Sequence, residues 1–122
     1  MHVHHQGRAT YTLIDPPVTP RGTPVIRQVT MGTNTAAGEV RQLFVGNSWK
    51  RSEIPPEDLK AVQDGKTSPD EVGCLITEVV APGFVWEDHA FLTLEELHSL
   101  FKNGEDGGEK LIELFKPYLR KT

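Results

Sequence analysis

The amino-acid sequence predicts an all-β fold, an antiparallel jelly-roll (cupin-like) barrel or sandwich, followed by C-terminal α-helices. Over the first three quarters of the chain, short segments rich in β-branched and aromatic residues are separated by Gly- and Pro-rich turns, without the regularly alternating helices of an α/β fold. After residue 92 the apolar residues recur every three or four positions, as on one face of a helix. We therefore expect a β domain over residues 1–92 and a helical extension over residues 93–122 packed on it, with oligomerisation through these helices as the alternative.

The strands are predicted from β-forming residues and from the turns that bound them. A loop dense in Pro and Gly at residues 16–24 and the turns Gly46-Asn47 and Pro82-Gly83 are the clearest breaks. Pro56 suits the first position of a helix, so one or two helical turns are expected over residues 57–63. The predicted strands cover residues 8–15, 25–31, 40–45, 49–54 and 72–80, and residues 84–88 continue in an extended conformation.

Two helices are predicted after residue 92. Thr93 and Glu96 form a capping-box pattern at the start of the first helix, and Asn103-Gly104 suits its end. The second helix is expected to begin near Gly108 and to end or kink at Pro117, which cannot donate a backbone hydrogen bond. The apolar residues of the two helices are Leu94, Leu97, Leu100 and Phe101, then Leu111, Ile112, Leu114 and Phe115.

Composition excludes several classes of function. The 122 residues are 37% hydrophobic and 25% charged, which is typical of one globular domain. With 13 basic and 17 acidic residues the net charge is −4, which argues against a general nucleic-acid binder and a polybasic membrane anchor. No apolar run approaches the roughly 20 residues of a membrane span, and the polar N-terminus does not resemble a secretory signal. The single cysteine, Cys74, excludes an internal disulfide and a cysteine-built zinc site, so we expect a cytosolic protein.

Polar side chains interrupt three otherwise apolar strand faces. Gln28 lies between Ile26 and Thr30 on one face, and Gln42 and Glu78 interrupt two further faces. A barrel with a small ligand cavity would show this pattern, and so would edge strands whose polar side chains face solvent. The sequence leaves both interpretations open.

Three segments form a pattern that points to a family. Residues 38–45 read G-E-V-R-Q-L-F-V, residues 49–50 read W-K, and residues 73–88 read G-C-L-I-T-E-V-V-A-P-G-F-V-W-E-D. With His5-Gln6-Gly7, they resemble a small, largely uncharacterised branch of the RmlC-like cupin superfamily, over about residues 3–92. The resemblance implies a jelly-roll barrel, usually dimeric, with a pocket at its mouth and a shape similar to sugar-nucleotide epimerases. The matching members extend further at the N-terminus, so we expect only about half of a jelly roll here.

His2 and His4 form the H-x-H element with which metal-binding cupins begin their ligand set. In those proteins a Glu and a distant His complete the site, but Arg8 and Ala9 stand where the Glu is expected and Trp49 where the late His is expected. We therefore predict no metal and no cofactor, and we expect the N-terminal histidines to be solvated on a flexible terminus.

Other catalytic patterns are weak. Glu87 and His89 can share a strand face and exchange protons, but a polar strand end before the helix is the simpler interpretation. Cys74 lies in an apolar run, where its thiol would be inert. Neither a G-x-S-x-G motif nor a phosphate-binding glycine pattern is found.

Aromatic residues are the better indication of a ligand. Trp49, Phe84 and Trp86 flank the turns at one end of the expected barrel, although Trp49 and Trp86 could simply plug it. The polar groups expected to orient a ligand are Tyr11, Arg27, Gln42, Lys50 and Glu78.

We therefore predict a protein that binds a small molecule, with isomerase or epimerase-type chemistry on a sugar or another small polar metabolite. Glu78 or His5 would act as base and Tyr11 as acid, while Arg27 and Lys50 would hold an anionic group. A non-catalytic binding or dimerisation domain is the alternative, and a metal-dependent oxygenase is disfavoured by the missing ligands.

Two structural expectations follow. Glu78 should face the barrel interior and be the carboxylate with the most strongly shifted pKa, because it lies in the most apolar strand. The protein should be a homodimer joined through strands, because half a jelly roll exposes unpaired edges. The strand at residues 8–15 or the one at residues 25–31 is the expected edge.

Overall fold

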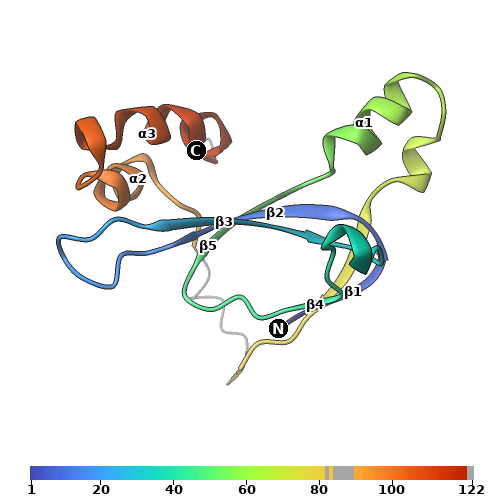
Figure 1. Cartoon of the computed structure of the whole chain (residues 1–122), viewed down its shortest axis with the longest axis horizontal. Coiled ribbons are helices and arrows are strands. Elements are labelled where there is room, and N and C mark those ends of the chain that lie inside the picture. Colours follow the sequence, from blue (N-terminus) through green and yellow to red (C-terminus); the bar gives the residue numbers. More distant parts are fainter. Residues whose placement is uncertain (82, 84–89, 121–122) are drawn as a thin grey trace.

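The computed structural model describes residues 1–81, 83 and 90–120, and it contains two three-stranded antiparallel sheets (Figure 1). The predicted class, mostly β with C-terminal helices, is confirmed, although the described strands form two sheets rather than one closed barrel. The extended segment predicted at residues 84–88 lies outside the described residues.

In order across the first sheet, the strands are β4 (Gln42–Leu43), β1 (His2–Gly7) and β6 (Cys74–Glu78). In the second sheet they are β3 (Val25–Met31), β2 (Ala9–Asp15) and β5 (Trp49–Glu53).

The second sheet is covered on both faces. Tyr11 and Leu13 of β2 are buried on the face that meets the first sheet, and Ile14 is buried on the opposite face against the C-terminal helices. Figure 1 shows α2 (Leu94–Phe101) and α3 (Glu109–Phe115) above β2 and β3, with β1 and β4 below them. The strand β2 is therefore buried along most of its length, and the sheet to which it belongs is the middle layer.

The N-terminus is the central strand of the first sheet, so the expectation of a flexible terminus is wrong, and the expectation of solvated histidines holds for His5 but not for His2 and His4. His2 and His4 are only 8% and 3% exposed. Residues two apart on a strand share a face, so both side chains point away from solvent. The strand β1 pairs with β6 from the other half of the chain, with Val3 opposite Thr77. A partner so distant leaves no local signal in the sequence.

The helices begin where their caps predict. The helix α1 (Pro56–Gln63) has Pro56 in its first turn. At the start of α2, Thr93 Oγ1 accepts the backbone N–H of Glu96 at 3.1 Å, and the Thr93 hydroxyl donates to the Glu96 carboxylate at 2.9 Å. The second bond of the capping pattern therefore uses the hydroxyl of Thr93 rather than its backbone amide. Short 3-10 helices cover Thr35–Ala37, Pro69–Glu71, Glu105–Gly108 and Lys116–Tyr118.

The turn between β1 and β2 is held by a close backbone contact and an ionic cluster. Gly7 has a φ of +79°, and a Cβ at this position would lie 1.7 Å from the Gly73 carbonyl oxygen. The next residue, Arg8, donates to Glu39 and Asp58, each at 3.2 Å, so it links the turn to α1 and to the loop after β3. These carboxylates raise the pKa of the Arg8 guanidinium, which stays charged.

The two predicted edge strands differ in outcome. The strand β3 pairs with β2 along its length, and among the described residues its other side carries only the isolated bridge between Met31 and Val40, so β3 is an edge, as expected. The expectation for residues 8–15 is wrong because β2 is the central strand. Both flanking strands satisfy the backbone of β2, so it offers no free edge. Within the described residues, no helix is long and apolar enough to cross a membrane.

Candidate functional site

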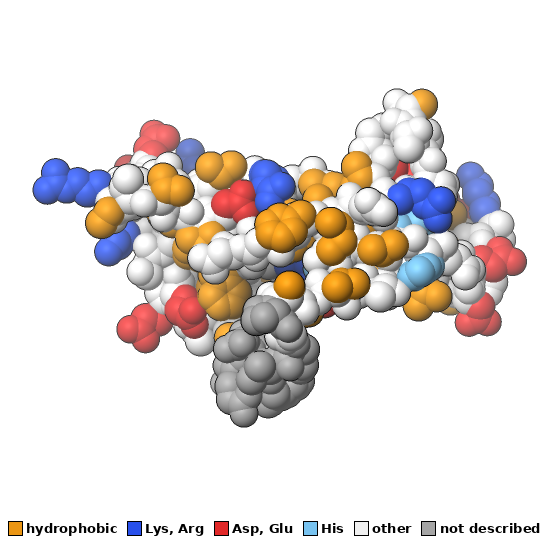
Figure 2. Space-filling model, turned by 90° about the horizontal axis from the view of Figure 1, so that it is seen from below, with side chains coloured by type: hydrophobic (Ala, Val, Ile, Leu, Met, Phe, Trp, Pro, Cys, Tyr) orange, Lys and Arg blue, Asp and Glu red, His pale blue; other side chains and the backbone are white. Residues whose placement is uncertain are grey.

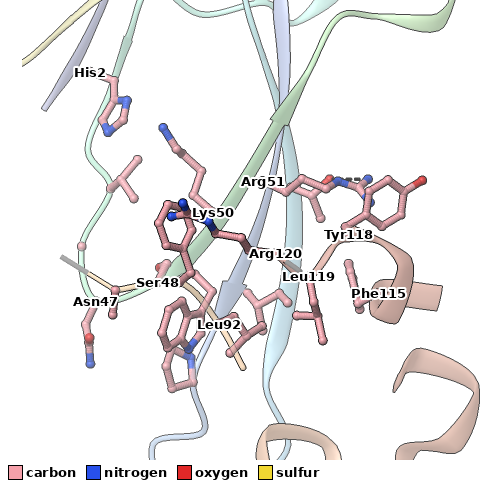
Figure 3. A pocket seen from close by; sticks show the side chains of 18 of the residues that line it. His2, Asn47, Ser48, Lys50, Arg51, Leu92, Phe115, Tyr118, Leu119 and Arg120 are labelled. Atoms are coloured by element: carbon pink, nitrogen blue, oxygen red, sulfur yellow. Dashed lines mark hydrogen bonds between the residues drawn. The ribbon is translucent and has the colours of Figure 1, made fainter. Parts of the chain in front are cut away.

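A cavity of about 790 Å³ surrounds the edge strand β5. Lys50 of β5 pairs with Leu13, whose side chain faces the first sheet, whereas Arg51 pairs with Thr12 on the opposite face. Figure 3 accordingly shows Lys50 on the same side of the ribbon as His2, and Arg51 on the side of Tyr118. We call the part lined by His2, Lys50 and Glu78 the inner compartment. The outer compartment is lined by Trp49, Arg51, Phe115, Tyr118 and Leu119.

The inner compartment brings together four titratable side chains from both sheets. The Tyr11 hydroxyl lies 3.1 Å from His2 Nδ1, and the same nitrogen lies 3.6 Å from Glu78 Oε1. Lys50 Nζ lies 3.3 Å from Glu78 Oε1 and 4.8 Å from the centre of the Tyr11 ring. Because each group lies close to the next, a proton gained or lost at one of them changes the charge felt by the others.

Burial fixes the protonation of two members of this cluster. Burial, followed by the nearby Lys50 ammonium group, lowers the pKa of His2 below its usual value of 6.5, so the imidazole is neutral at pH 7. Burial raises the pKa of Tyr11 to about 12, with smaller contributions from Cys74 and Glu78. The phenol is therefore protonated and acts as the donor to Nδ1 of His2.

Two of the cations that line the cavity lie over aromatic rings. The Arg51 guanidinium lies 3.8 Å from the centre of the Tyr118 ring, and its Nη2 donates to Thr12 Oγ1 at 3.4 Å and to Glu53 at 3.3 Å. The Arg120 guanidinium lies 4.4 Å from the centre of the Phe91 ring. Such contacts hold the flat guanidinium groups in defined positions.

The pocket is positively charged although the chain is acidic. Among the described residues, its lining includes three cationic side chains, Lys50, Arg51 and Arg120, and one carboxylate, Glu78. With His2 neutral, these lining residues sum to +2, and Glu53, which pairs with Arg51 from outside the lining, offsets one of these charges, whereas the whole chain carries −4. A local excess of positive charge in a partly enclosed site favours an anionic ligand.

Tyr11, Trp49, Lys50 and Glu78 are the predicted site residues that the fold brings to this pocket. Trp49, Lys50 and Glu78 line it, and Tyr11 lies directly behind His2 and Lys50. The expected burial of Glu78 is wrong, since its side chain is 49% exposed. The strand β6 is an edge strand and Glu78 is its last residue, so solvent reaches the carboxylate and the desolvation argument fails.

His5, Arg27 and Gln42 do not line the pocket. Arg27 Nε donates to Asp15 at 2.8 Å across β2 and β3, and this contact lowers the pKa of Asp15. His5 occupies an irregularity in the pairing of β1, where its exposed ring lies 2.6 Å from Thr77 Oγ1. Gln42 is exposed on β4. Phe84, Trp86 and the Glu87-Asp88-His89 segment lie outside the described residues.

Four functional candidates were missed by the sequence prediction. His2 was interpreted only as a metal ligand, and its alternation with Val3 would have placed Val3 rather than His2 toward the core. No sequence motif marks the positions of Arg51, Tyr118 and Arg120. They reach the pocket because β5 is an edge strand and because the chain after α3 returns to it.

The described residues contain no group of three His, Cys, Asp or Glu side chains that could hold a metal ion. The His4 side chain, one of the two histidines of the H-x-H element, forms a hydrogen bond within its own strand: its Nε2 donates to the Gly7 carbonyl oxygen at 2.6 Å. Its Nδ1 is buried without a hydrogen-bond partner among the described residues.

Comparison with known proteins gives one match. A family model described as Cupin superfamily (DUF985) matches residues 1–92. Neither the curated proteins nor the solved structures contain a match to the chain. The matched range includes all four residues of the inner-compartment cluster and ends before α2, so the residues after α3 that line the pocket lie outside it.

Proposed function

Because the chain belongs to the cupin superfamily, in the family described as DUF985, we propose that the cavity around β5 binds a small anionic metabolite. The observation that carries the proposal is the excess of cationic over acidic side chains in the described lining, within a chain of net charge −4. A cavity of about 790 Å³ is in the size range of small-molecule sites. Family membership alone would not give this function, because one fold hosts many activities.

Lys50 is the residue on which anion binding depends most. Its ammonium group is held between Glu78 and the Tyr11 ring, and its side chain is 26% exposed, so it is both positioned and accessible. Glu78 neutralises part of this charge. Arg120 has no carboxylate partner among the described residues, so its charge remains available to a ligand.

A second candidate function is proton transfer on the bound molecule, as in an isomerase or epimerase. Because Nδ1 of neutral His2 accepts the Tyr11 hydroxyl, the imidazole carries its proton on Nε2. His2 can take up a second proton at Nδ1 only when the Tyr11 hydroxyl turns away, and the buried, protonated Tyr11, which does not line the pocket, can supply a proton only through His2. Glu78, 3.6 Å from His2, would stabilise the imidazolium that forms. In this proposal His2 takes the role of base that the sequence analysis gave to Glu78 or His5.

Binding is tested by thermal denaturation and calorimetric titration with glucose 6-phosphate, using uncharged glucose as the control ligand. We expect stabilisation by the phosphate ester only, by about 2.7 kcal/mol at a hundred times its dissociation constant. Lys50→Ala should weaken binding at least about tenfold, the effect of losing roughly 1.4 kcal/mol of interaction. Lys60→Ala, which removes an exposed lysine of α1, should not. Equal effects of the two variants would refute the proposed site.

We also propose that the protein is a homodimer that pairs through the edge of β3. Val25 and Ile26 of this strand are 59% and 36% exposed, and an unpaired edge favours pairing with another chain. The first sheet offers an alternative interface. Leu75 of β6 points away from the core between the sheets and is 61% exposed, and Figure 2 shows hydrophobic side chains gathered on the underside of the molecule.

Sedimentation equilibrium tests the dimer. We expect twice the chain mass of 13.6 kDa for the wild type and a monomer for Ile26→Lys. Leu75→Lys should leave the dimer intact, and the opposite pattern would move the interface to the first sheet. A wild-type monomer at micromolar concentration would refute the proposal.

A further inference from the structure

We infer that Glu78 determines which anion the inner compartment takes, by accepting a hydrogen bond from a hydroxyl group that lies close to the ligand's anionic group. The inference deepens the proposed anion site at Lys50 and rests on it. It uses side chains on one face of β5 only: Lys50 of β5, and His2 and Glu78 of the first sheet, which this face meets.

Glu78 and Lys50 reach the same point of the cavity from different sheets. Glu78 is paired with His2 across β6 and β1, and directly opposed residues share a face, so its carboxylate lies on the side of the buried His2 ring. Oε1 of Glu78 lies 3.3 Å from Lys50 Nζ and 3.6 Å from His2 Nδ1. The carboxylate is therefore held beside the cation that would bind the anionic group.

Glu78 also remains accessible to a ligand. Its side chain lines the cavity and is 49% exposed, and its contacts with Lys50 and His2 both involve Oε1. An ionised carboxylate accepts hydrogen bonds at about four lone-pair sites on its two oxygens, so sites remain for a donor of the ligand. Among the described lining residues it is the one carboxylate, and hence the strongest acceptor.

A carboxylate at this place disfavours a simple anion. Its negative charge offsets part of the Lys50 charge and repels a second negative group, so an anion that offers no donor is bound less well. A ligand that sets a hydroxyl group against Glu78 gains a charge-assisted hydrogen bond instead. The pair of Lys50 and Glu78 therefore favours a ligand that combines an anionic group with a donor.

The spacing of this pair indicates how close the two ligand groups are. Charge-assisted hydrogen bonds are about 2.5–2.9 Å long, and the Lys50 and Glu78 atoms that would form them are only 3.3 Å apart. Two ligand groups bound side by side are therefore separated by a few bonds, as in sugar phosphates and hydroxy acids. An ammonium group could also donate to Glu78, but Lys50 would repel it, whereas a hydroxyl is neutral.

The experiment compares three phosphate monoesters by calorimetric titration of the full chain. Glycerol 3-phosphate carries the hydroxyl groups, propyl phosphate lacks them, and 2-aminoethyl phosphate has an ammonium group in their place. We expect glycerol 3-phosphate to bind at least about tenfold more tightly than either of the other two, which is the effect of one hydrogen bond to a charged group.

Glu78→Gln tests the residue. It should reduce the preference for glycerol 3-phosphate over propyl phosphate to about threefold, because a neutral acceptor forms a hydrogen bond about half as strong. It should also strengthen the binding of propyl phosphate, since the repelling charge is gone, whereas a structural defect would weaken all three probes together. Glu53→Gln is the matched control, because Glu53 is a partly exposed carboxylate paired with a cation, Arg51, and does not line the cavity.

The outcomes separate the two proposals. If propyl phosphate binds the wild type as tightly as glycerol 3-phosphate, the anion site stands and the hydroxyl is overturned without any variant. If 2-aminoethyl phosphate binds most tightly, the donor is an ammonium group and the hydroxyl is again overturned. If Glu78→Gln keeps the wild-type preference, as Glu53→Gln should, the role of Glu78 is overturned. If none of the three esters binds, the anion site fails and the inference fails with it.

Discussion

The Tyr11 hydroxyl lies 3.1 Å from His2 Nδ1, and this hydrogen bond joins the two sheets at the floor of the pocket. Both side chains are buried, Tyr11 at 1% and His2 at 8% exposure, and their rings meet edge to face with centres 5.5 Å apart. This one contact therefore packs the two sheets together and also sets which nitrogen of His2 accepts a hydrogen bond in the candidate site.

Removing the hydroxyl should destabilise the protein. Tyr11→Phe keeps the ring but takes the donor from a buried imidazole nitrogen, which costs about 1–3 kcal/mol. The free energy of unfolding in urea measures the loss. Tyr118→Phe is the control, because Tyr118 is 57% exposed and has no hydrogen-bonded hydroxyl among the described residues; its effect should stay within about 0.5 kcal/mol. Equal losses in the two variants would contradict the prediction.

Acidification should weaken the fold through His2. An unfolded histidine takes up its proton near pH 6.5, whereas burial and Lys50 lower the pKa of His2 in the folded protein. The unfolded chain therefore binds more protons in this range, so stability is retained above pH 6.5 and falls as the pH drops through the lowered pKa.

Urea unfolding between about pH 8 and about pH 5 checks this prediction. His2→Gln should show a flatter dependence of stability on pH than the wild type. His98→Gln changes an exposed histidine of α2 and should follow the wild-type curve. If both variants follow the wild-type curve, His2 is not the group responsible.

Gly7 should be among the least replaceable residues. Gly7→Ala would place a methyl group 1.7 Å from the Gly73 carbonyl oxygen, so one of the two backbones must move. Gly65→Ala is a matched control, because Gly65 has a similar φ of +73° but no atom within 4 Å of the added carbon. We expect a loss of about 1–2 kcal/mol for Gly65→Ala, from the left-handed backbone alone, and a clearly larger loss or failure to fold for Gly7→Ala. Similar losses would show that the contact with Gly73 relaxes easily.

Arg8 should stabilise the link between the sheets and α1. Arg8→Met leaves the Glu39 carboxylate, which is 7% exposed, without its cation. Because the Arg8 side chain is itself 30% exposed, we expect a loss of about 1–3 kcal/mol rather than the larger cost of a fully buried pair. Arg21→Met, at an exposed position in the loop after β2, is the control. Chemical denaturation that gives the same midpoint for both variants would refute this role.

Local patterns predicted most of the elements. The strand β3 has the predicted bounds, and α1, α2 and α3 begin close to the Pro, Thr and Gly residues that cap them. The strand β1 was missed, because its partners are remote and its histidines do not read as a strand. The segment 40–45 contains only the short strand Gln42–Leu43, so β-propensity alone overestimated it.

The candidate site was only partly predictable. Tyr11, Lys50 and Glu78 could be selected because their residue types suit proton transfer and anion binding. Whether such residues meet is decided by pairing between distant strands, and this pairing excluded Arg27 and added His2. Tyr118 and Arg120 could not be predicted, because the path of the chain after α3 depends on how the helices pack on Ile14.

The antiparallel pairing of β1 with β6 also has a consequence for how the protein is made. His5 and Thr77, which are hydrogen-bonded across these strands, are 72 residues apart. At ribosomal rates of about 5–20 residues per second, β1 waits roughly 4–14 s after its own synthesis before β6, the partner on one of its two edges, exists. During that interval the nascent chain exposes an unpaired strand, which is a target for chaperones and for aggregation. A chain stalled before β6 has no inner compartment, so binding competence comes late in biosynthesis.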